Sequence, residues 1–266
     1  VKTRIALFAA LGLAVAGAVA GALWWTLAPP PRADPAKLTV ALSGHFIGSG
    51  LVFIAQERGY FAEEGLAVDI QRHTSGASAL ASALGGRADL ATAGDTPLTF
   101  AALEGAPFSI VATIFTSGGT YGIVARRDRG IATTADLAGK AIGATLGTDG
   151  HFVAGVLLSS SGLPMSAARL VNFGPEELAG ALAAGTVDAV STWEPWLGHA
   201  RKALGDDAVV LLPDSGFRFN FSLAGRKSWV DTNQDRVRRL LRALDRALEL
   251  AESSPADAQA IVARAT

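Results

Sequence analysis

The sequence has no cysteine in its 266 residues. This absence excludes disulfide frameworks, thiolate zinc sites, iron–sulfur clusters, cysteine nucleophiles and the lipid-modified cysteine of a lipoprotein. Only four histidines are present. They are widely separated and do not have the H-E-x-x-H spacing of a metal site. We therefore expect no resident metal, and the redox compartment has to be inferred from targeting signals.

Enzyme signatures are also missing. There is no G-x-S-x-G nucleophile elbow, and Gly139-Lys140 lacks the preceding glycine and the following Ser or Thr of a phosphate-binding loop. A catalytic triad assembled from distant residues leaves no such signature, so that alternative stays open. We expect a binding protein without catalytic residues or a cofactor.

Charged residues are few, at 18% of the chain, whereas hydrophobic residues make up 50%. This balance excludes intrinsic disorder, which requires low hydrophobicity and high net charge. The 23 Lys and Arg residues against 24 Asp and Glu residues give a net charge of −1. Since there is no basic surplus, nucleic acid is not an expected partner.

The N-terminal segment, residues 1–36, resembles an export signal. Lys2 and Arg4 precede an uncharged run over residues 5–27, and a proline-rich spacer follows. The run exceeds the roughly 7–15 apolar residues of a cleaved signal and matches the roughly 20 needed to span a bilayer. We predict a membrane anchor, with a cleaved signal as the alternative. In both cases the remainder of the chain is extracytoplasmic, in the periplasm or its equivalent.

The exported part alternates between short apolar runs and helical patterns, which indicates an α/β protein with largely parallel sheets. Strands are predicted at residues 37–43, 66–73, 88–94, 108–115, 121–127, 140–145, 168–173, 187–193 and 208–213. Residues 235–251 form a basic amphipathic pattern. We expect this helix to dock on a sheet with its arginines in solvent, and a membrane or partner contact is the alternative.

Two segments resemble each other, residues 80–95 and residues 178–194. Each combines a small-residue helix, a Gly-x-x-Asp turn and a strand. Asp89 and Asp188 are expected to close structural turns. Chance similarity remains the alternative, because both segments are short and biased in composition.

Six residues after each of these aspartates stands a second carboxylate, Asp95 in the first segment and Glu194 in the second. Both follow the carboxyl end of a predicted strand, where open α/β sheets bind ligands. Nearby prolines place both in loops. We predict that the two acids face one shared ligand cleft, together with Thr96 and Trp193.

Two turns follow strands and open helices, and free N–H groups at such positions attract anions or ligand oxygens. The first contributes Ser75, Gly76 and Ala77, and the second contributes Thr148, Asp149 and His151. The alternative is that Ser75 and Thr148 or Asp149 only cap their helices. His45 and Phe46 follow the first strand in a glycine-rich loop and complete the candidate ligand contacts.

Residues 59–70, "GYFAEEGLAVDI", resemble a signature of the NMT1/THI5-like and SsuA-like solute-binding proteins of ABC importers. Further motifs of that family follow in the same order, at residues 83–97, 130–144, 161–164 and 184–195. The resemblance implies a type II periplasmic-binding-protein fold that closes around a ligand by hinge motion. It assigns residues 37–124 and 216–266 to lobe one and residues 125–215 to lobe two.

The resemblance also implies a monomer that hands a small molecule to the permease subunits of an ABC importer. Members bind sulfonates, taurine, nitrate, bicarbonate-like anions or thiamine pyrimidine precursors. The pyrimidine-synthesising members carry a cysteine-rich segment, which this chain lacks. A membrane-tethered sensor is the alternative role. The family continues with further helix beyond Thr266, so a fragment or an early stop is expected.

The two predicted carboxylates favour one ligand class over simple anions. Each carboxylate repels an anion in a closed cleft of low dielectric constant, whereas it attracts an ammonium or N–H donor. The helix N-termini require an anion or an acceptor. We therefore expect a zwitterionic or donor-rich ligand, with an aminoalkanesulfonate such as taurine first and nitrate or an aminopyrimidine as alternatives.

Overall fold

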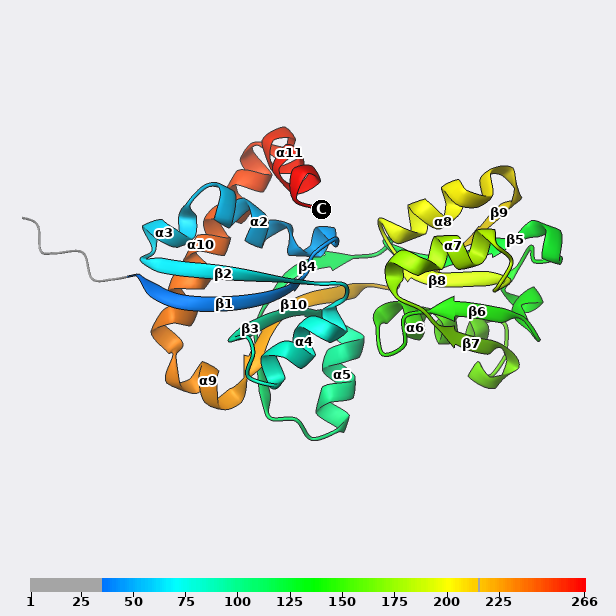
Figure 1. Ribbon diagram of the computed structural model, residues 1–266, viewed down its shortest axis with the longest axis horizontal. Helices are drawn as coiled ribbons and strands as arrows, with labels where there is room; N and C mark the ends of the chain where they lie inside the picture. The colour runs from blue at the N-terminus through cyan, green and yellow to red at the C-terminus, as the bar shows by residue number, and fades with distance from the viewer. Residues whose placement is uncertain (1–34, 215) are drawn as a thin grey trace, which may run out of the picture. The chain divides into compact units, whose positions relative to one another are not determined.

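The computed structural model describes residues 35–214 and 216–266, and these build two five-stranded sheets (Figure 1). The predicted export segment lies almost wholly outside the described residues. Among the helices described, none has both the length and the apolar character that crossing a bilayer requires.

The first sheet has the strand order β2-β1-β3-β10-β4 and belongs to what we call the first lobe. Its strands are β1 (Ala36–Ser43), β2 (Leu66–His73), β3 (Leu90–Gly94), β4 (Phe108–Ser117) and β10 (Phe219–Arg226). The second sheet has the order β7-β6-β8-β5-β9 and belongs to the second lobe. Its strands are β5 (Tyr121–Arg126), β6 (Ala141–Ala144), β7 (Arg169–Asn172), β8 (Ala189–Trp193) and β9 (Ala208–Leu211).

One strand in each sheet runs against the others. β10 pairs antiparallel with β3 and β4, and β5 pairs antiparallel with β8 and β9. The remaining strands of each sheet share one direction, which agrees with the predicted largely parallel sheets. The sequence did not predict β10, although Phe219 and Phe221 alternate there with polar residues.

Helices cover both faces of each sheet. In the first lobe α4 and α5 pack on one face, and α2, α10 and α11 pack on the other (Figure 1). In the second lobe α6 lies on one face and α7 and α8 on the other. The helices are α2 (Gly50–Glu57), α3 (Tyr60–Glu63), α4 (Gly76–Leu84), α5 (Asp95–Leu103), α6 (Asp149–Ser160), α7 (Leu178–Ala183), α8 (Trp196–Leu204), α9 (Lys227–Thr232), α10 (Gln234–Ser253) and α11 (Pro255–Ala265).

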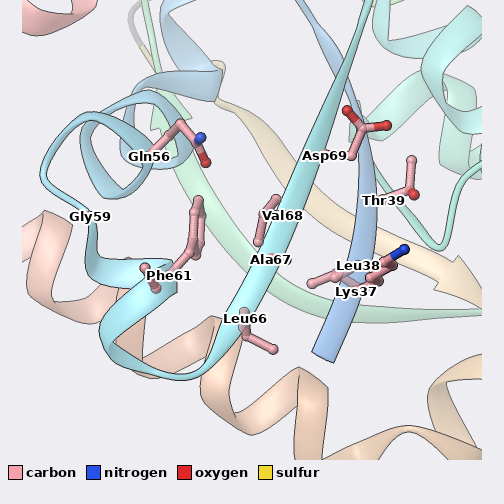
Figure 2. Close-up of a pocket in the computed structure, with 11 residues that line it drawn as sticks. Lys37, Leu38, Thr39, Gln56, Gly59, Phe61, Leu66, Ala67, Val68 and Asp69 are labelled. Atoms are coloured by element: carbon pink, nitrogen blue, oxygen red, sulfur yellow. The ribbon is translucent and has the colours of Figure 1, made fainter. Parts of the chain in front are cut away.

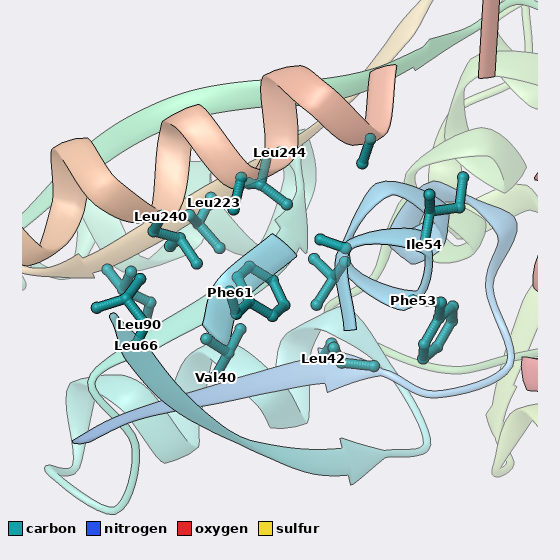
Figure 3. Close-up of a cluster of buried hydrophobic side chains, with 14 of the residues drawn as sticks. Val40, Leu42, Phe53, Ile54, Phe61, Leu66, Leu90, Leu223, Leu240 and Leu244 are labelled. Carbon is teal, nitrogen blue, oxygen red and sulfur yellow. The ribbon is translucent and has the colours of Figure 1, made fainter. Parts of the chain in front are cut away.

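Helix α10 docks on the first sheet through its apolar side. Leu240 and Leu244 are buried against Leu223 and Phe61 in the largest core cluster (Figure 3). On its basic side, Arg242 pairs with Glu64 at 2.6 Å and Arg246 pairs with Glu63 at 2.6 Å. These two arginines thus bind acids at the end of α3 and just after it, which supports docking on the sheet over a membrane contact.

The internal similarity seen in the sequence corresponds to equivalent positions in the two sheets. β3 and β8 each occupy the centre of their sheet. Asp89 Oδ2 accepts a hydrogen bond from the Thr39 N–H at 2.8 Å, and Asp188 Oδ2 accepts one from the Ala141 N–H at 2.9 Å. Each aspartate therefore ties the start of its strand to the neighbouring parallel strand, a structural role that differs from the turn closure predicted from the sequence.

Two segments connect the lobes. The first joins β4 to β5 across residues 118–120, and the second joins β9 to β10. The predicted border between residues 124 and 125 falls inside β5, which pairs over nearly its whole length with second-sheet strands. Strand character alone does not tell which sheet a crossing strand joins.

Candidate functional site

A small cavity lies between the lobes, at the carboxyl ends of β1, β3 and β8. Its lining residues are Ser43, Phe46, Gly76, Ala77, Gly94, Pro97, Tyr121, Thr148, Asp149, Trp193 and Phe221. Its volume is about 20 Å³, which is room for roughly one water molecule. A ligand of several heavy atoms can enter only when the lobes separate.

Asp149, the first residue of α6 in the second lobe, is the one acid among the described residues that line this cavity. Its side chain is buried, and its Oδ1 accepts a hydrogen bond from the backbone N–H of Thr96 at 2.8 Å. Thr96 belongs to the first turn of α5, in the first lobe. The Tyr121 hydroxyl lies 3.4 Å from Asp149 Oδ2. The carboxylate therefore bridges the lobes at the positive end of a helix dipole.

Burial raises the pKa of the Asp149 carboxyl above its ordinary value, and the nearby negative Asp95 adds to the rise, although the Thr96 and Tyr121 hydrogen bonds oppose it. Burial also raises the pKa of Tyr121 well above its ordinary value, with Asp149 as a second cause. No Lys or Arg is among the described residues that line the cavity. A positively charged ligand group would supply the missing compensation for the Asp149 carboxylate.

The start of α4 forms another part of the wall. Gly76 and Ala77 are its first two residues, where backbone N–H groups have no partner within the helix. Ser75 does not extend this surface, because its Oγ accepts the Ser78 N–H at 3.2 Å in a capping box. For Ser75, the structure thus shows the capping arrangement that the sequence left open. Thr148 lines the cavity, but its hydroxyl donates to the Thr145 carbonyl at 2.6 Å.

Aromatic rings close the remaining sides. The Phe46 ring lies 4.8 Å from that of Phe221 and 6.1 Å from that of Tyr121, measured between centroids. Trp193, at the end of β8, is buried and lines the same space. These rings give the cavity apolar walls around two polar ends, the Asp149 carboxylate and the start of α4.

Two predicted histidines lie outside the cavity lining. His45 is exposed, and its Nδ1 lies 3.0 Å from the carbonyl oxygen of Thr266. Nδ1 of His151 accepts the Gly147 N–H at 3.2 Å, and burial lowers the pKa of that imidazole. Each ring therefore already has a hydrogen-bond partner in the protein, a distant one for His45 and a local one for His151. Across the described residues, no group of three or more His, Cys, Asp or Glu side chains is arranged to hold a metal ion.

The two acids singled out in the sequence point elsewhere. Asp95 begins α5 instead of lying in a loop, because Pro97 at the third helical position is compatible with a first turn. Its Oδ2 accepts the Asn220 N–H at 2.9 Å. Glu194 Oε2 accepts the Gly198 N–H at 3.0 Å, at the start of α8. Neither is among the residues that line the cavity.

Several lining residues were not predicted. Ser43, Gly94 and Pro97 stand at strand or helix ends, a position that was itself the available signal. Tyr121 and Phe221 lie in strands, and they reach the cleft because β5 pairs with β8 and β10 pairs with β3. Sequence periodicity alone does not reveal which lobe surface a strand residue faces.

A larger open pocket, of about 570 Å³, lies away from the cleft (Figure 2). It runs along the outer strand β2 and the turn before α3, and its lining includes Lys37, Phe61 and Asp69. We place the candidate site in the smaller cavity, because that cavity joins helix N-termini, a buried acid and both lobes.

The chain is similar in sequence to known proteins. The family model described as NMT1/THI5 like matches residues 48–258. A putative binding protein of Brucella abortus is 24% identical over 236 residues, which are 87% of this chain and 72% of that protein. The taurine-binding periplasmic protein of Escherichia coli is 28% identical over 159 residues, which are 59% of this chain and 48% of that protein.

Among solved structures, the alkanesulfonate-binding protein SsuA from Xanthomonas axonopodis pv. citri bound to MOPS superposes with a TM-score of 0.71. The identity is 24%, and the match covers 87% of this chain and 80% of that chain. The structural likeness to this protein and to the E. coli periplasmic SsuA confirms the predicted two-lobe periplasmic-binding-protein fold.

Proposed function

Because the chain belongs to the NMT1/THI5-like family, we propose that it is the extracytoplasmic solute-binding protein of an ABC importer and captures a small aminoalkanesulfonate. The lobes close over the ligand and present it to the permease subunits. Relatives named for taurine and alkanesulfonate binding support the ligand class.

The observation that carries this proposal is the buried Asp149 carboxylate in a cavity that the start of α4 also lines. An ammonium group pairs with Asp149, while a sulfonate accepts hydrogen bonds from the N–H groups of Gly76 and Ala77. Asp149 thus takes the part that the sequence assigned to Asp95 and Glu194. A plain anion such as nitrate leaves the carboxylate uncompensated in a closed cleft.

Isothermal titration of the full chain with taurine, ethanesulfonate and nitrate tests the proposal. Taurine should bind most tightly, because ethanesulfonate lacks the ammonium. Asp149→Asn should weaken taurine binding by about 1.5–3 kcal/mol, the range for a hydrogen bond to a charged group. Glu194→Gln is the matched control, since its side chain bonds to Gly198, and it should leave affinity unchanged. Preference for nitrate, or an unaffected Asp149→Asn variant, would overturn the assignment.

A further inference from the structure

The Asp149 carboxylate is buried without a cation that neutralises it. The described residues that line the cavity include no Lys or Arg, and Asp149 takes part in none of the salt bridges of the described chain. A counter-ion from solution cannot stand in, because the cavity of about 20 Å³ has room for roughly one water molecule and none for a hydrated cation. A buried carboxylate in such surroundings is neutralised by a proton instead.

The titratable groups around Asp149 add no positive charge that would hold the carboxylate ionised. Asp95, from α5, adds a second negative charge, and Tyr121, from β5, presents a phenol whose pKa is raised by burial, so the phenol stays neutral. The lining residues from β3, β8, β10 and α4 carry no ionisable side chain. On α6 itself, His151 accepts the Gly147 N–H, and burial lowers the pKa of its imidazole.

The hydrogen bonds of Asp149 leave one of its two oxygens for a proton. Oδ1 accepts the Thr96 N–H at 2.8 Å, and a proton on that oxygen would compete with this bond. Oδ2 lies 3.4 Å from the Tyr121 hydroxyl, which can donate to a charged carboxylate and can accept from a protonated one. The cleft therefore has a place for the proton at Oδ2, with the bond between the lobes retained.

We propose that Asp149 holds a proton in the ligand-free cleft and exchanges it for the ammonium group of a ligand. This inference rests on the proposed function, in which an ammonium pairs with Asp149. On exchange the Oδ2–H bond breaks, its electron pair stays on the carboxylate and the proton passes to solvent, while an ammonium N–H donates to the same oxygen. A ligand that brings only an anion leaves the proton in place, because two negative charges would otherwise meet in a cleft of low dielectric constant.

The exchange predicts opposite pH dependences for taurine and ethanesulfonate, two probes that differ only in the amino group. Both probes keep their charges between pH 4 and pH 7, so a change in affinity reports on the protein. Titrated against the full chain, taurine should bind about tenfold or more weakly at pH 4 than at pH 7, whereas ethanesulfonate should bind more tightly at pH 4. Potentiometric titration in unbuffered salt should find about half a proton or more released per taurine at pH 4 and close to none at pH 7.

Three variants identify the group that gives up the proton. Asp149→Asn has no proton to exchange, so both pH dependences should disappear. Glu194→Gln is the matched control, because it makes the same change of carboxylate to amide outside the cavity lining, and it should retain both. His151→Gln should also retain both, which excludes the imidazole of the same helix as the source.

Two neighbours of Asp149 should move the pH dependence in opposite directions. The Tyr121 hydrogen bond lowers the pKa of the Asp149 carboxyl, so Tyr121→Phe should shift the taurine transition to higher pH. The negative charge of Asp95 raises that pKa, so Asp95→Asn should shift the transition to lower pH. A purely structural effect of either variant would change affinity at every pH without moving the transition.

Infrared spectra of the ligand-free protein separate this inference from the proposed function. Between pH 4 and pH 7, the C=O stretching band of a protonated carboxyl should be stronger in the wild type than in Asp149→Asn. If the two spectra are alike, or if taurine binds without releasing a proton, the inference is overturned while the proposed function stands. If the band depends on Asp149 but taurine does not bind, the proton site stands and the ligand assignment falls.

Discussion

The Asp149 carboxylate of the second lobe accepts a hydrogen bond from the Thr96 N–H of the first lobe, at 2.8 Å. This bond places an anion of the chain itself at the start of α5, where a ligand anion would otherwise gain from the helix dipole. It also holds the lobes together over a cavity with room for one water. Under the proposed function, a ligand that brings an ammonium competes for Asp149, so the same residue would both hold the cleft closed and recognise the ligand.

Gly94→Ala tests whether this contact controls closure. A Cβ on Gly94 would clash with Asp149 Oδ2, whereas the φ of −76° suits alanine. The new methyl should therefore displace the carboxylate and wedge the lobes apart without misfolding either lobe, with an overpacking penalty of about 1–3 kcal/mol. Small-angle scattering should show a larger radius of gyration, and taurine affinity should fall at least tenfold.

Two further variants serve as controls for Gly94→Ala. Gly180→Ala, in α7, places its Cβ in open space and should leave both measurements unchanged. The double variant Gly94→Ala with Asp149→Ala should behave like Asp149→Ala alone, because the clashing carboxylate is gone. A radius of gyration for Gly94→Ala equal to that of the wild type would show that Asp149 does not hold the cleft closed.

Asp149→Asn should also stabilise the ligand-free protein at neutral pH. Burial raises the native-state pKa of Asp149 above 3.8. The native state therefore holds this proton more tightly than the unfolded chain, and stability is lost as pH rises from the unfolded pKa through the native one. Asparagine keeps an acceptor for Thr96 without a buried charge.

Thermal unfolding of both proteins between pH 4 and pH 8 measures this effect. The gain in Tm of Asp149→Asn over the wild type should be largest at pH 8 and should shrink towards pH 4. Asp136→Asn should instead lower the Tm, because backbone N–H groups of Ala132 and Thr133 stabilise the charged form of that exposed carboxyl and lower its pKa. A gain for Asp149→Asn that is independent of pH would contradict a buried, uncompensated charge.

The sequence predicted the strands and the site region better than the roles of individual acids. Apolar runs located nine of the strands, because each is bounded by turns and helices. The sequence showed that Asp149 lies at a helix start. Its hydrogen bond to Thr96 depends on how the two lobes meet in space, which the sequence pattern does not show. Glu194 follows a strand end as expected. However, α8 begins two residues later, and the Glu194 carboxylate accepts a backbone hydrogen bond from the first turn of that helix.

Asp89 and Asp188 provide the last prediction, which concerns the internal similarity. Each accepts a backbone N–H from the adjacent parallel strand, from Thr39 and Ala141 respectively. Asp89→Ala and Asp188→Ala leave those amides without their acceptor, so each should lower the free energy of unfolding by about 1–3 kcal/mol. Both residues stand at the opposite end of their strands from the cavity, so taurine affinity should be unchanged. Chemical denaturation and titration of the two variants measure both quantities. If one variant is destabilised and the other is not, the two halves of the chain are alike in sequence and geometry but not in energetics.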